Sequence, residues 1–333
     1  MQEYNMLINN KWVTGANSLK VENPYDGSII ATVPHASKEQ VNEAIQSAAQ
    51  AFEVTKKLSA YERSQILNNI AQGIREREDE LAFTISKESG KPIQLAKGEI
   101  SRAIETFTFA GEEAKNITGE TVPMDAALKG KNRIAFTMLE PVGVIGAITP
   151  FNFPLNLVAH KVAPAIASGN TVVLKPSTYT PVTAVKLGEI ILNSQLPEGA
   201  FNIITGPGST LGDMLVTDDR VAKITFTGSP SVGIEIKKKC GLKKVTLELG
   251  SNSAVVVDKT VDFMKIIPRI AFGSFAYAGQ VCISIQRILV HDDIFDNFVK
   301  AFVEETRTIK FGDPLIEDIF IGPMIKEKEA LRA

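Results

Sequence analysis

Two cysteines, Cys240 and Cys282, are the thiols of this 333-residue sequence, and a thiolate is a strong nucleophile. Cys282 follows a segment of small residues that includes Gly273 and Gly279, and this pattern places its thiol near the junction of a helix and a loop. Cys240 precedes Gly241, a residue typical of helix ends, and is interpreted as a small buried apolar side chain. Because most cysteines are of this second kind, a thiol alone does not establish chemistry.

Glu248 is a carboxylate within the apolar pattern of a strand predicted over 245–249, and Gly250 lets a ligand or another backbone segment approach it. Burying an unpaired carboxylate is costly, and desolvation raises the pKa of a carboxyl group toward neutrality. A general base that works near pH 7 needs such a pKa. Two interpretations stay open from this residue alone: a general base, and a carboxylate paired with a structural lysine.

Asn152 follows the end of a predicted strand and stands between Pro150 and Pro154. A side-chain amide fixed at this point can donate a hydrogen bond to a developing oxyanion. The alternative is an asparagine that only forms a turn. The thiol, the carboxylate and the amide act together only if the fold brings them to one place.

The middle of the chain alternates between strand-like and helix-like segments. The apolar run over 142–148 predicts a strand that is buried on both faces. Such alternation is typical of successive βαβ units and predicts an open parallel sheet. Strands are predicted over 142–149, 171–174, 201–205, 223–227 and 245–249, and helices over 155–168, 181–195, 209–217 and 230–239.

Ligands bind such sheets at the carboxyl ends of the strands. Several polar residues of this sequence lie at those ends, namely Asn152, Lys175, Thr227, Ser229 and Glu248. The predicted sheet is therefore expected to gather them along one edge.

The regions on either side of this sheet have different patterns. From Ser37, where Ser37 and Gln40 resemble a capping box, helices are predicted up to about residue 116, including helices over 61–80 and 93–115. Residues 133–141 predict half of an extended hairpin. After Gly250 a second unit begins, with strands over 254–257 and 287–290 and helices over 263–278 and 294–308. Because so few strands would leave an edge and an apolar face exposed, this unit is expected to be unfinished.

Composition argues against several classes of protein. The sequence is 44% hydrophobic and 22% charged, as in globular proteins with about two domains. A formal net charge of −2 favours neither a nucleic acid nor an anionic membrane as partner. No segment approaches the roughly 20 apolar residues of a membrane span, and the N-terminus has no secretory pattern. Two cysteines make no disulfide framework, so we expect a cytoplasmic protein, and we expect no resident metal.

Four ordered segments together resemble a known family. They are TPFNFPLNLVAHKVAPAIASGNTVVLKPS, FTGSPSVG, LELGSN and the run GQVC at 279–282. In order and spacing they resemble the signatures of the NAD(P)-dependent aldehyde dehydrogenase superfamily, and the resemblance covers nearly the whole chain. It implies an α/β fold with a variant Rossmann cofactor domain and an α/β catalytic domain that is incomplete here.

The resemblance implies roles for four residues. Cys282 matches the nucleophile, Glu248 matches the base that activates the deacylating water, and Asn152 matches the oxyanion donor, working with the backbone N–H of Cys282. Lys161 matches a lysine near the proton route. The implied reaction oxidises a small-molecule aldehyde to a carboxylic acid through a thiohemiacetal and a thioester on Cys282.

The resemblance also implies a site for NADP or NAD. Lys175 matches the lysine beside the adenosine ribose. Thr178 stands where NAD-preferring members often place a glutamate, so the charge that would repel a 2′-phosphate is gone. The helix that begins after Ser229 is expected to receive the pyrophosphate at its N-terminus. The residues expected to bind the cofactor are Thr149, Pro150, Phe151, Lys175, Ser177, Thr178, Gly208, Phe226, Thr227, Gly228, Ser229, Val232, Gly233 and Leu249.

The sequence departs from the family pattern at two points. Ser251 stands where a second glycine is common, which resembles the branch of lactaldehyde and non-phosphorylating glyceraldehyde-3-phosphate dehydrogenases. The glutamate with which the family holds the nicotinamide ribose would lie beyond residue 333. We expect an NAD(P)-binding domain over 1–120 and 139–249, the start of an oligomerisation hairpin over 121–138 and a truncated catalytic domain over 250–333. These residues alone are expected to be an inactive fragment of a homodimer or homotetramer.

Two rival interpretations stay open. An acylating dehydrogenase would release the thioester with coenzyme A instead of water, but such enzymes commonly lack the base that Glu248 matches. A protein with the dehydrogenase fold could also bind without catalysing a reaction. The joint presence of Cys282, Glu248 and Asn152 argues against this second interpretation.

Overall fold

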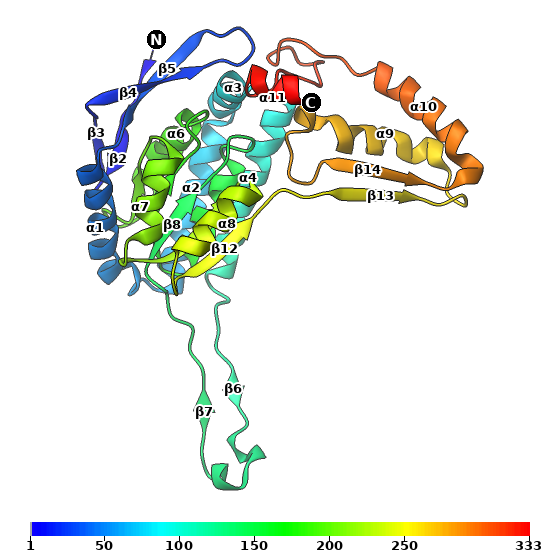
Figure 1. Ribbon diagram of the computed structural model, residues 1–333. Coiled ribbons are helices and arrows are strands. Elements are labelled where there is room, and N and C mark those ends of the chain that lie inside the picture. The colour runs from blue at the N-terminus through cyan, green and yellow to red at the C-terminus, as the bar shows by residue number, and fades with distance from the viewer. Residues whose placement is uncertain (1) are drawn as a thin grey trace.

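In the computed structural model, which describes residues 2–333, a seven-stranded sheet of order β12-β11-β8-β9-β10-β2-β3 lies at the centre of the larger part of the molecule (Figure 1). The strands from β12 to β10 run parallel, as the alternating pattern predicts. Every residue of β8 is buried, so the prediction of a strand covered on both faces is confirmed. The bounds of these strands are β8 (Val144–Ile148), β9 (Thr171–Lys175), β10 (Phe201–Ile203), β11 (Val221–Thr227) and β12 (Lys244–Glu248).

The N-terminal strands were missed. β2 (Met6–Ile8) and β3 (Lys11–Val13) join the sheet in antiparallel fashion, so the prediction of a purely parallel sheet is wrong at this edge. Each has three residues, too few to display a periodicity, and they are joined by a tight turn at Asn9 and Asn10 with positive φ. A second sheet has the order β1-β5-β4, formed by β1 (Gln2–Glu3), β4 (Asn17–Glu22) and β5 (Ile29–His35).

Helices cover both faces of the large sheet, because its buried strands are apolar on both sides. Ile145 of β8 belongs to the core cluster that includes α2 to α6, whereas its neighbour Val144 belongs to the cluster with α1, α7 and α8. The predicted capping box at Ser37 and Gln40 is confirmed at the start of α1. The bounds are α1 (Lys38–Thr55), α2 (Ala60–Glu76), α3 (Glu78–Ser89), α4 (Ile93–Glu113), α5 (Asn156–Ala167), α6 (Val182–Leu192), α7 (Asp213–Thr217) and α8 (Pro230–Lys239).

The helix predicted over 61–80 is in fact two helices. Arg77 leaves helical geometry, with φ −116° and ψ 23°, so α2 ends and α3 begins on either side of it. The apolar periodicity continues through this break, because both helices bury side chains in the same core cluster. Periodicity alone therefore could not reveal the break.

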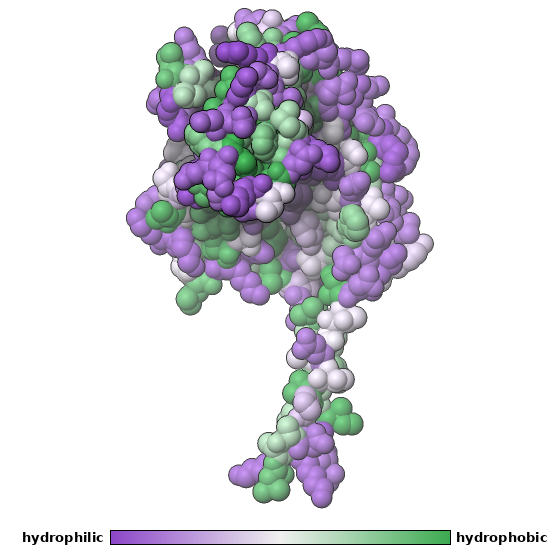
Figure 2. Space-filling model, turned by 90° about the vertical axis from the view of Figure 1, so that its right-hand side faces the viewer, coloured by the Kyte–Doolittle hydropathy of each residue, from purple (hydrophilic) through white to green (hydrophobic). Residues whose placement is uncertain are grey.

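A hairpin projects from this body. β6 (Thr121–Val122) and β7 (Ala135–Phe136) pair in antiparallel fashion, as residues 133–141 predict, and extend far from the sheet (Figure 1). Its apolar side chains stand out along the arm in Figure 2. The most exposed are Leu128 (96%), Ile134 (93%), Met138 (73%), Leu139 (68%) and Phe136 (67%).

The chain beyond Gly250 forms a smaller unit. β13 (Ser253–Val257) and β14 (Ile285–Val290) make a two-stranded parallel sheet, and α9 (Phe263–Phe275) and α10 (Phe295–Arg307) pack with it in a small core. The chain then returns to the larger body, where α11 (Glu327–Arg332) lies near α3 (Figure 1). The domain limits at 120, 139 and 250 stay predictions. Within residues 2–333, no helix combines the length and apolarity that crossing a membrane requires.

Candidate active site

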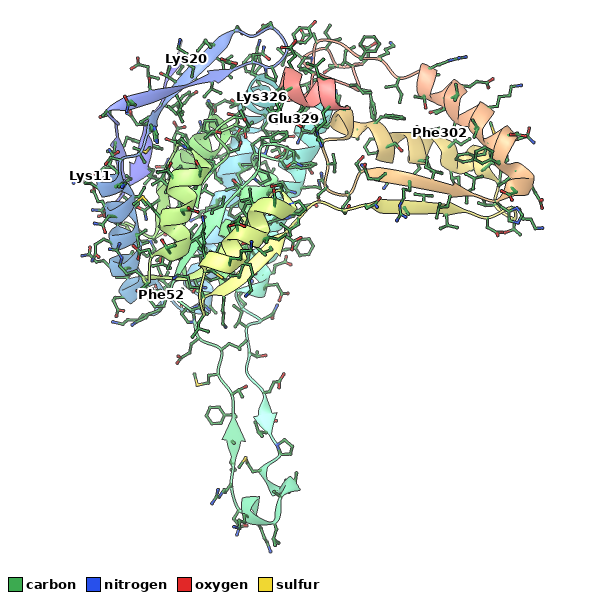
Figure 3. The ribbon with its side chains drawn as sticks, in the orientation of Figure 1. Lys11, Lys20, Phe52, Phe302, Lys326 and Glu329 are labelled. Carbon is green, nitrogen blue, oxygen red and sulfur yellow. The ribbon has the colours of Figure 1, made fainter. Side chains whose placement is uncertain are left out.

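A pocket of about 410 Å³ opens at the carboxyl ends of β8, β11 and β12, a volume within the range of about 300–1,000 Å³ typical of ligand sites. Asn152, Glu248 and Cys282 all line it, so the structure brings the three candidate groups to one place. The C-terminal segment closes one side, where Lys326 and the α11 residue Glu329 lie (Figure 3).

Cys282 is held by an unusual stretch of backbone. Its side chain is exposed, whereas Cys240 at the end of α8 is buried. Tyr277, Ala278 and Gly279 have φ values of 53°, 53° and 71°, three left-handed residues in succession. Such a conformation is unfavourable for residues with a Cβ and persists where neighbouring contacts enforce it. The chain therefore leaves α9 abruptly and presents the thiol to the pocket.

Asn152 is tied to the segment that carries Cys282. Its Nδ2 donates to the carbonyl oxygen of Gln280, at 2.9 Å. A side-chain amide has two N–H donors, so the second remains free for another acceptor. Its Oδ1 is buried and has no hydrogen-bond partner among the described residues. The contact fixes the amide of Asn152 against Gln280, which is two residues before Cys282 in the sequence.

Glu248 differs from its prediction. It was expected to be buried in its strand, and this is wrong, because its side chain is exposed. The physical reason is that β12 is the edge strand of the sheet and Glu248 is its last residue. Its backbone is nevertheless fixed, since its carbonyl accepts a hydrogen bond from the N–H of Gly228, at 3.0 Å. The carboxylate thus lies at the pocket in contact with solvent.

Lys161 is a buried amine that does not line the pocket of Cys282 and instead lines a neighbouring hollow with Thr225. Its Nζ donates to the hydroxyls of Thr227, at 2.7 Å, and Thr225, at 3.2 Å. Burial lowers the pKa of Lys161 to about 8, and the negative charge of Glu248 opposes that shift. A buried amine that titrates near neutrality is suited to proton transfer.

A second cleft of about 480 Å³ lies between α8 and the turn before α7, and three residues predicted for the cofactor site, Gly208, Phe226 and Val232, line it. At its edge, Lys175 is buried and donates to the carbonyl of Pro176, at 2.8 Å. Gly208 lies close to this amine, since a Cβ built on Gly208 would be 3.9 Å from the Nζ of Lys175. Burial lowers the pKa of Lys175 to about 8. Among residues 2–333, no carboxylate forms an ion pair with this lysine, so it remains available to an anion.

The start of α8 borders both pockets. Ser229 caps this helix by accepting from the N–H of Val232, at 3.4 Å. A Cβ on Gly233 would lie 2.7 Å from a methyl carbon of Leu249, so a larger residue at this position would require the Leu249 side chain to move. A helix N-terminus beside a buried cation fits the diphosphate and ribose phosphate of a dinucleotide.

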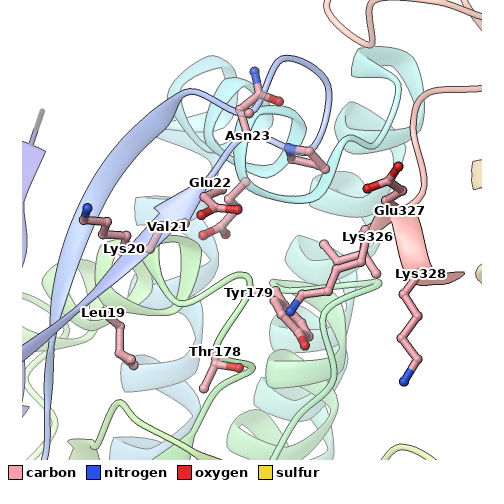
Figure 4. Close-up of a pocket in the computed structure, with 14 residues that line it drawn as sticks. Leu19, Lys20, Val21, Glu22, Asn23, Thr178, Tyr179, Lys326, Glu327 and Lys328 are labelled. Carbon is pink, nitrogen blue, oxygen red and sulfur yellow. The ribbon is translucent and has the colours of Figure 1, made fainter. Parts of the chain in front are cut away.

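The remaining predicted cofactor residues are distributed over three places. Pro150, Phe151, Thr227, Gly228, Ser229 and Leu249 line the pocket of Cys282. Thr149 is buried, and its hydroxyl has no partner among the described residues. Thr178 lines a different hollow beside Tyr179 and Lys326, drawn in Figure 4, and Ser177 accepts from the N–H of Tyr179, at 3.2 Å.

Sequence reasoning missed Gln280, whose backbone carbonyl binds Asn152 and whose side-chain Oε1 accepts from the N–H of Ile325, at 3.0 Å. It also missed Glu99, which is fully buried on α4. A signal existed for Glu99, because its position falls on the apolar face of that helix between Ala96 and Ala103.

The fold thus places a cleft lined by predicted cofactor residues near a pocket with a thiol, an amide and a carboxylate. A profile of the aldehyde dehydrogenase family matches residues 12–333. The 3-sulfolactaldehyde dehydrogenase of Priestia aryabhattai is 45% identical over 332 residues, which are 100% of this chain and 69% of that protein.

Solved structures agree with this match. Aldehyde dehydrogenase 21 from Physcomitrella patens, in complex with the reaction product succinate, superposes with a TM-score of 0.95 at 39% identity, over 99% of this chain and 69% of that one. Glyceraldehyde-3-phosphate dehydrogenase from Methanocaldococcus jannaschii, complexed with NADP, superposes with a TM-score of 0.91 at 42% identity. The match covers 95% of this chain and 69% of that one. The chain belongs to the aldehyde dehydrogenase family, whose activity is the oxidation of an aldehyde with NAD(P)⁺.

Proposed function

We propose that Cys282 is the nucleophile of this oxidation, that Asn152 is the oxyanion donor and that Glu248 is the general base. The observation that carries the proposal is their meeting in one pocket, with Asn152 hydrogen-bonded to the backbone just before the thiol. Exposure of Cys282 and burial of Cys240 support the choice between the two thiols.

In the first half of the reaction, the thiolate of Cys282 attacks the aldehyde carbon and the carbonyl oxygen becomes an oxyanion. The free N–H of the Asn152 amide and the backbone N–H of Cys282 donate to this oxygen. A bound NAD(P)⁺ would supply the hydride acceptor, and loss of hydride from the adduct on Cys282 would leave a thioester. The left-handed turn at Tyr277 and Ala278 supports this role, because it redirects the chain so that Cys282 lines the pocket.

In the second half, Glu248 removes a proton from a water molecule that attacks the thioester carbon. The C–S bond breaks, the carboxylic acid leaves and the thiolate of Cys282 is restored. Lys161 and the hydroxyl of Thr227 provide the neighbouring acceptors and donors through which the proton leaves Glu248. Glu248 at the pocket favours water over coenzyme A as the acceptor of the acyl group.

For the cofactor, Lys175 with Gly208 and the N-terminus of α8 fit a phosphate-bearing ligand. We propose that both NADP and NAD are used, because the family resemblance places an uncharged threonine, Thr178, where a glutamate would repel the 2′-phosphate. Thr178 lines a hollow separate from the cleft of Gly208, so this step rests on the resemblance. A relative of 42% identity was solved with NADP.

The substrate we propose is a short polar aldehyde. The relatives named 3-sulfolactaldehyde dehydrogenase and lactaldehyde dehydrogenase, at 45% and 43% identity, support this class. Lys326 lines the pocket and favours an aldehyde that also carries an anionic group, whereas Arg332 is already paired with Glu329, at 3.0 Å.

We further propose that the protein forms a homodimer or homotetramer through the β6–β7 hairpin. Its exposed apolar residues, Leu128, Ile134 and Phe136 among them, form a surface that another copy would cover.

The test of the proposed function compares Cys282→Ala with Cys240→Ala. In a protein extended to the length of its relatives, of which this chain covers 69%, iodoacetamide should label Cys282 faster than the buried Cys240, and only Cys282→Ala should abolish turnover of lactaldehyde and 3-sulfolactaldehyde with NAD(P)⁺. The turnover measurements described below use the same extended protein. The product should be the free acid with or without coenzyme A. Equal labelling of the two thiols, with turnover surviving in Cys282→Ala, would refute the proposal.

A further inference from the structure

A buried ion pair joins Lys91 and Glu99. Lys91 lies in the connection between α3 and α4, and Glu99 lies on α4. Their side chains are 1% and 0% exposed, and the Nζ of Lys91 contacts the Oε2 of Glu99. Desolvation lowers the pKa of Lys91, and the charge of Glu99 opposes that shift. Taking two charges out of water is expensive, and such a pair is often no more stabilising than apolar residues of the same size.

Glu99 uses its other oxygen to fix the start of α5. Its Oε1 accepts from the backbone N–H of Leu155, at 2.9 Å, and of Asn156, at 3.0 Å. These N–H groups lie at the N-terminus of α5, where they have no partner within the helix and where a carboxylate is favoured. Asn152 is only three residues before Leu155. The carboxylate therefore anchors the loop that carries the amide.

Lys91 contacts both loops of the active site. Its Nζ lies 3.8 Å from the ring centroid of Phe153 and 4.9 Å from that of Tyr277. Both distances are within the roughly 6 Å at which a cation is attracted to an aromatic face. Phe153 is adjacent to Asn152, and Tyr277 begins the left-handed turn that leads to Cys282.

Tyr277 is held at its other end as well. It is fully buried, and its hydroxyl donates to the carbonyl of Ser89, at 2.7 Å, next to the connection that contains Lys91. The two active-site loops meet each other directly through Asn152 and the carbonyl of Gln280. Lys91 lies against an aromatic ring from each of the two loops. Neither Lys91 nor Glu99 lines the pocket itself.

We infer that Lys91 and Glu99 are positioning residues that set the separation between the amide of Asn152 and the thiol of Cys282, an inference that rests on the proposed roles of these two groups. The pair acts through Phe153, Tyr277 and the start of α5, without touching the substrate. Because small displacements of reacting groups reduce rates strongly, this positioning should be visible in the chemical step.

The test uses the double variant Lys91→Met/Glu99→Gln, which removes both charges and leaves no uncompensated ion. The amide oxygen that Glu99→Gln introduces can still accept from the N–H groups of Leu155 and Asn156. The first-turnover rate of NADPH formation should fall by roughly tenfold or more, whereas the Kd for NADP should change less than about twofold. Lys91→Arg keeps a cation between the rings and should restore most of that rate.

The matched control is Lys186→Met/Glu80→Gln. Lys186 forms an ion pair with Glu80 and lies 5.8 Å from the ring centroid of Tyr4, so it is also a cation beside an aromatic ring, but remote from both loops. This variant should lower Tm without slowing the first turnover. If the Lys91 and Glu99 double variant does not fold, Phe153→Leu removes one ring from the cation and should slow the same step.

An unchanged first-turnover rate in the folded double variant, or in Phe153→Leu, would overturn the inference. So would losses of rate and NADP affinity in equal proportion, which indicate general disruption. Failure of the proposed function is distinguishable, because turnover would then survive in Cys282→Ala.

Discussion

The side-chain hydroxyl of Ser251 donates a hydrogen bond to the backbone carbonyl of Cys282. The same hydroxyl lies 2.9 Å from that of Ser253. The sequence presents Ser251 only as a departure from a common glycine. In the structure it links the chain after β12 to the peptide of the proposed nucleophile, so the departure has a physical consequence at the site.

We predict that Ser251→Gly slows the first turnover by about fivefold, because one hydrogen bond contributes about 1 kcal/mol and the peptide of Cys282 loses a restraint. The Kd for NADP should be unchanged. Stopped-flow measurement of NADPH formation checks this, with Ser253→Ala as the control that leaves the contact to Cys282 intact. Identical first-turnover rates in Ser251→Gly and the parent would show that the contact has no role in catalysis.

Glu248→Gln should separate the two halves of the reaction. Thioester hydrolysis should slow by roughly 100-fold, since a positioned base contributes about that much or more, while the first turnover persists as a burst. Rapid-quench analysis should find acyl groups on Cys282. Glu304→Gln, at an exposed position of α10 that lines neither the pocket of Cys282 nor the cofactor cleft, serves as the control. Full steady-state turnover in Glu248→Gln would contradict its role as the base.

Local patterns were sufficient for most elements of the fold, whereas the roles of the site residues come from the family resemblance and stay predictions. α8 begins and ends where the sequence predicts, because Ser229 and Pro230 start it and Gly241 follows its end. The three-residue strands β2 and β3 could not be recognised, since they are too short to establish an alternation of buried and exposed residues. Their place in the sheet comes from tertiary contacts with β10.

The sequence predicts which residue types meet at the pocket, but not how exposed each side chain is or which distant residues support it. Glu248 was expected to be buried because its strand is apolar, but an edge strand has a neighbour on one side only. The contact of Glu99 with the start of α5 joins residues 56 positions apart in the sequence. Such a contact depends on how α4 packs on α5, which no local pattern encodes.

Lys161 should make stability depend on pH. Its pKa is about 8 in the folded protein and about 10.5 when solvated, so between these values the unfolded chain holds more protons. The free energy of unfolding therefore rises with pH across this window, by about 3 kcal/mol from this residue. Below pH 8 both states hold the proton, so the destabilisation that burial of Lys161 causes does not change with pH. Relative to Lys161→Met, the parent should gain unfolding free energy between pH 7.5 and 10. A pH-independent difference between the two would rule out the buried amine as its source.

The last prediction concerns Lys175 and the choice between the two dinucleotides. Burial lowers the pKa of Lys175 to about 8 in the protein without cofactor, and an anion beside it would favour the charged amine. Binding of the 2′-phosphate of NADP should then require a proton on Lys175. Below pH 8 this proton is present and affinity is constant. Above pH 8 the apparent Kd for NADP should rise, approaching a tenfold increase per pH unit.

NAD lacks the 2′-phosphate, so its Kd measured with the same protein should change much less between pH 7 and 9.5. Lys175→Met should remove the pH dependence for NADP and lower its affinity toward that of NAD. Thr178→Glu should shift the preference toward NAD, because a carboxylate near the ribose repels the phosphate, and Thr178→Gln is the uncharged control at the same position. Isothermal titration calorimetry at each pH measures the Kd of both cofactors for all four proteins. Equal pH slopes for NADP and NAD, or a preference that Thr178→Glu leaves unchanged, would show that these residues do not contact the ribose phosphate.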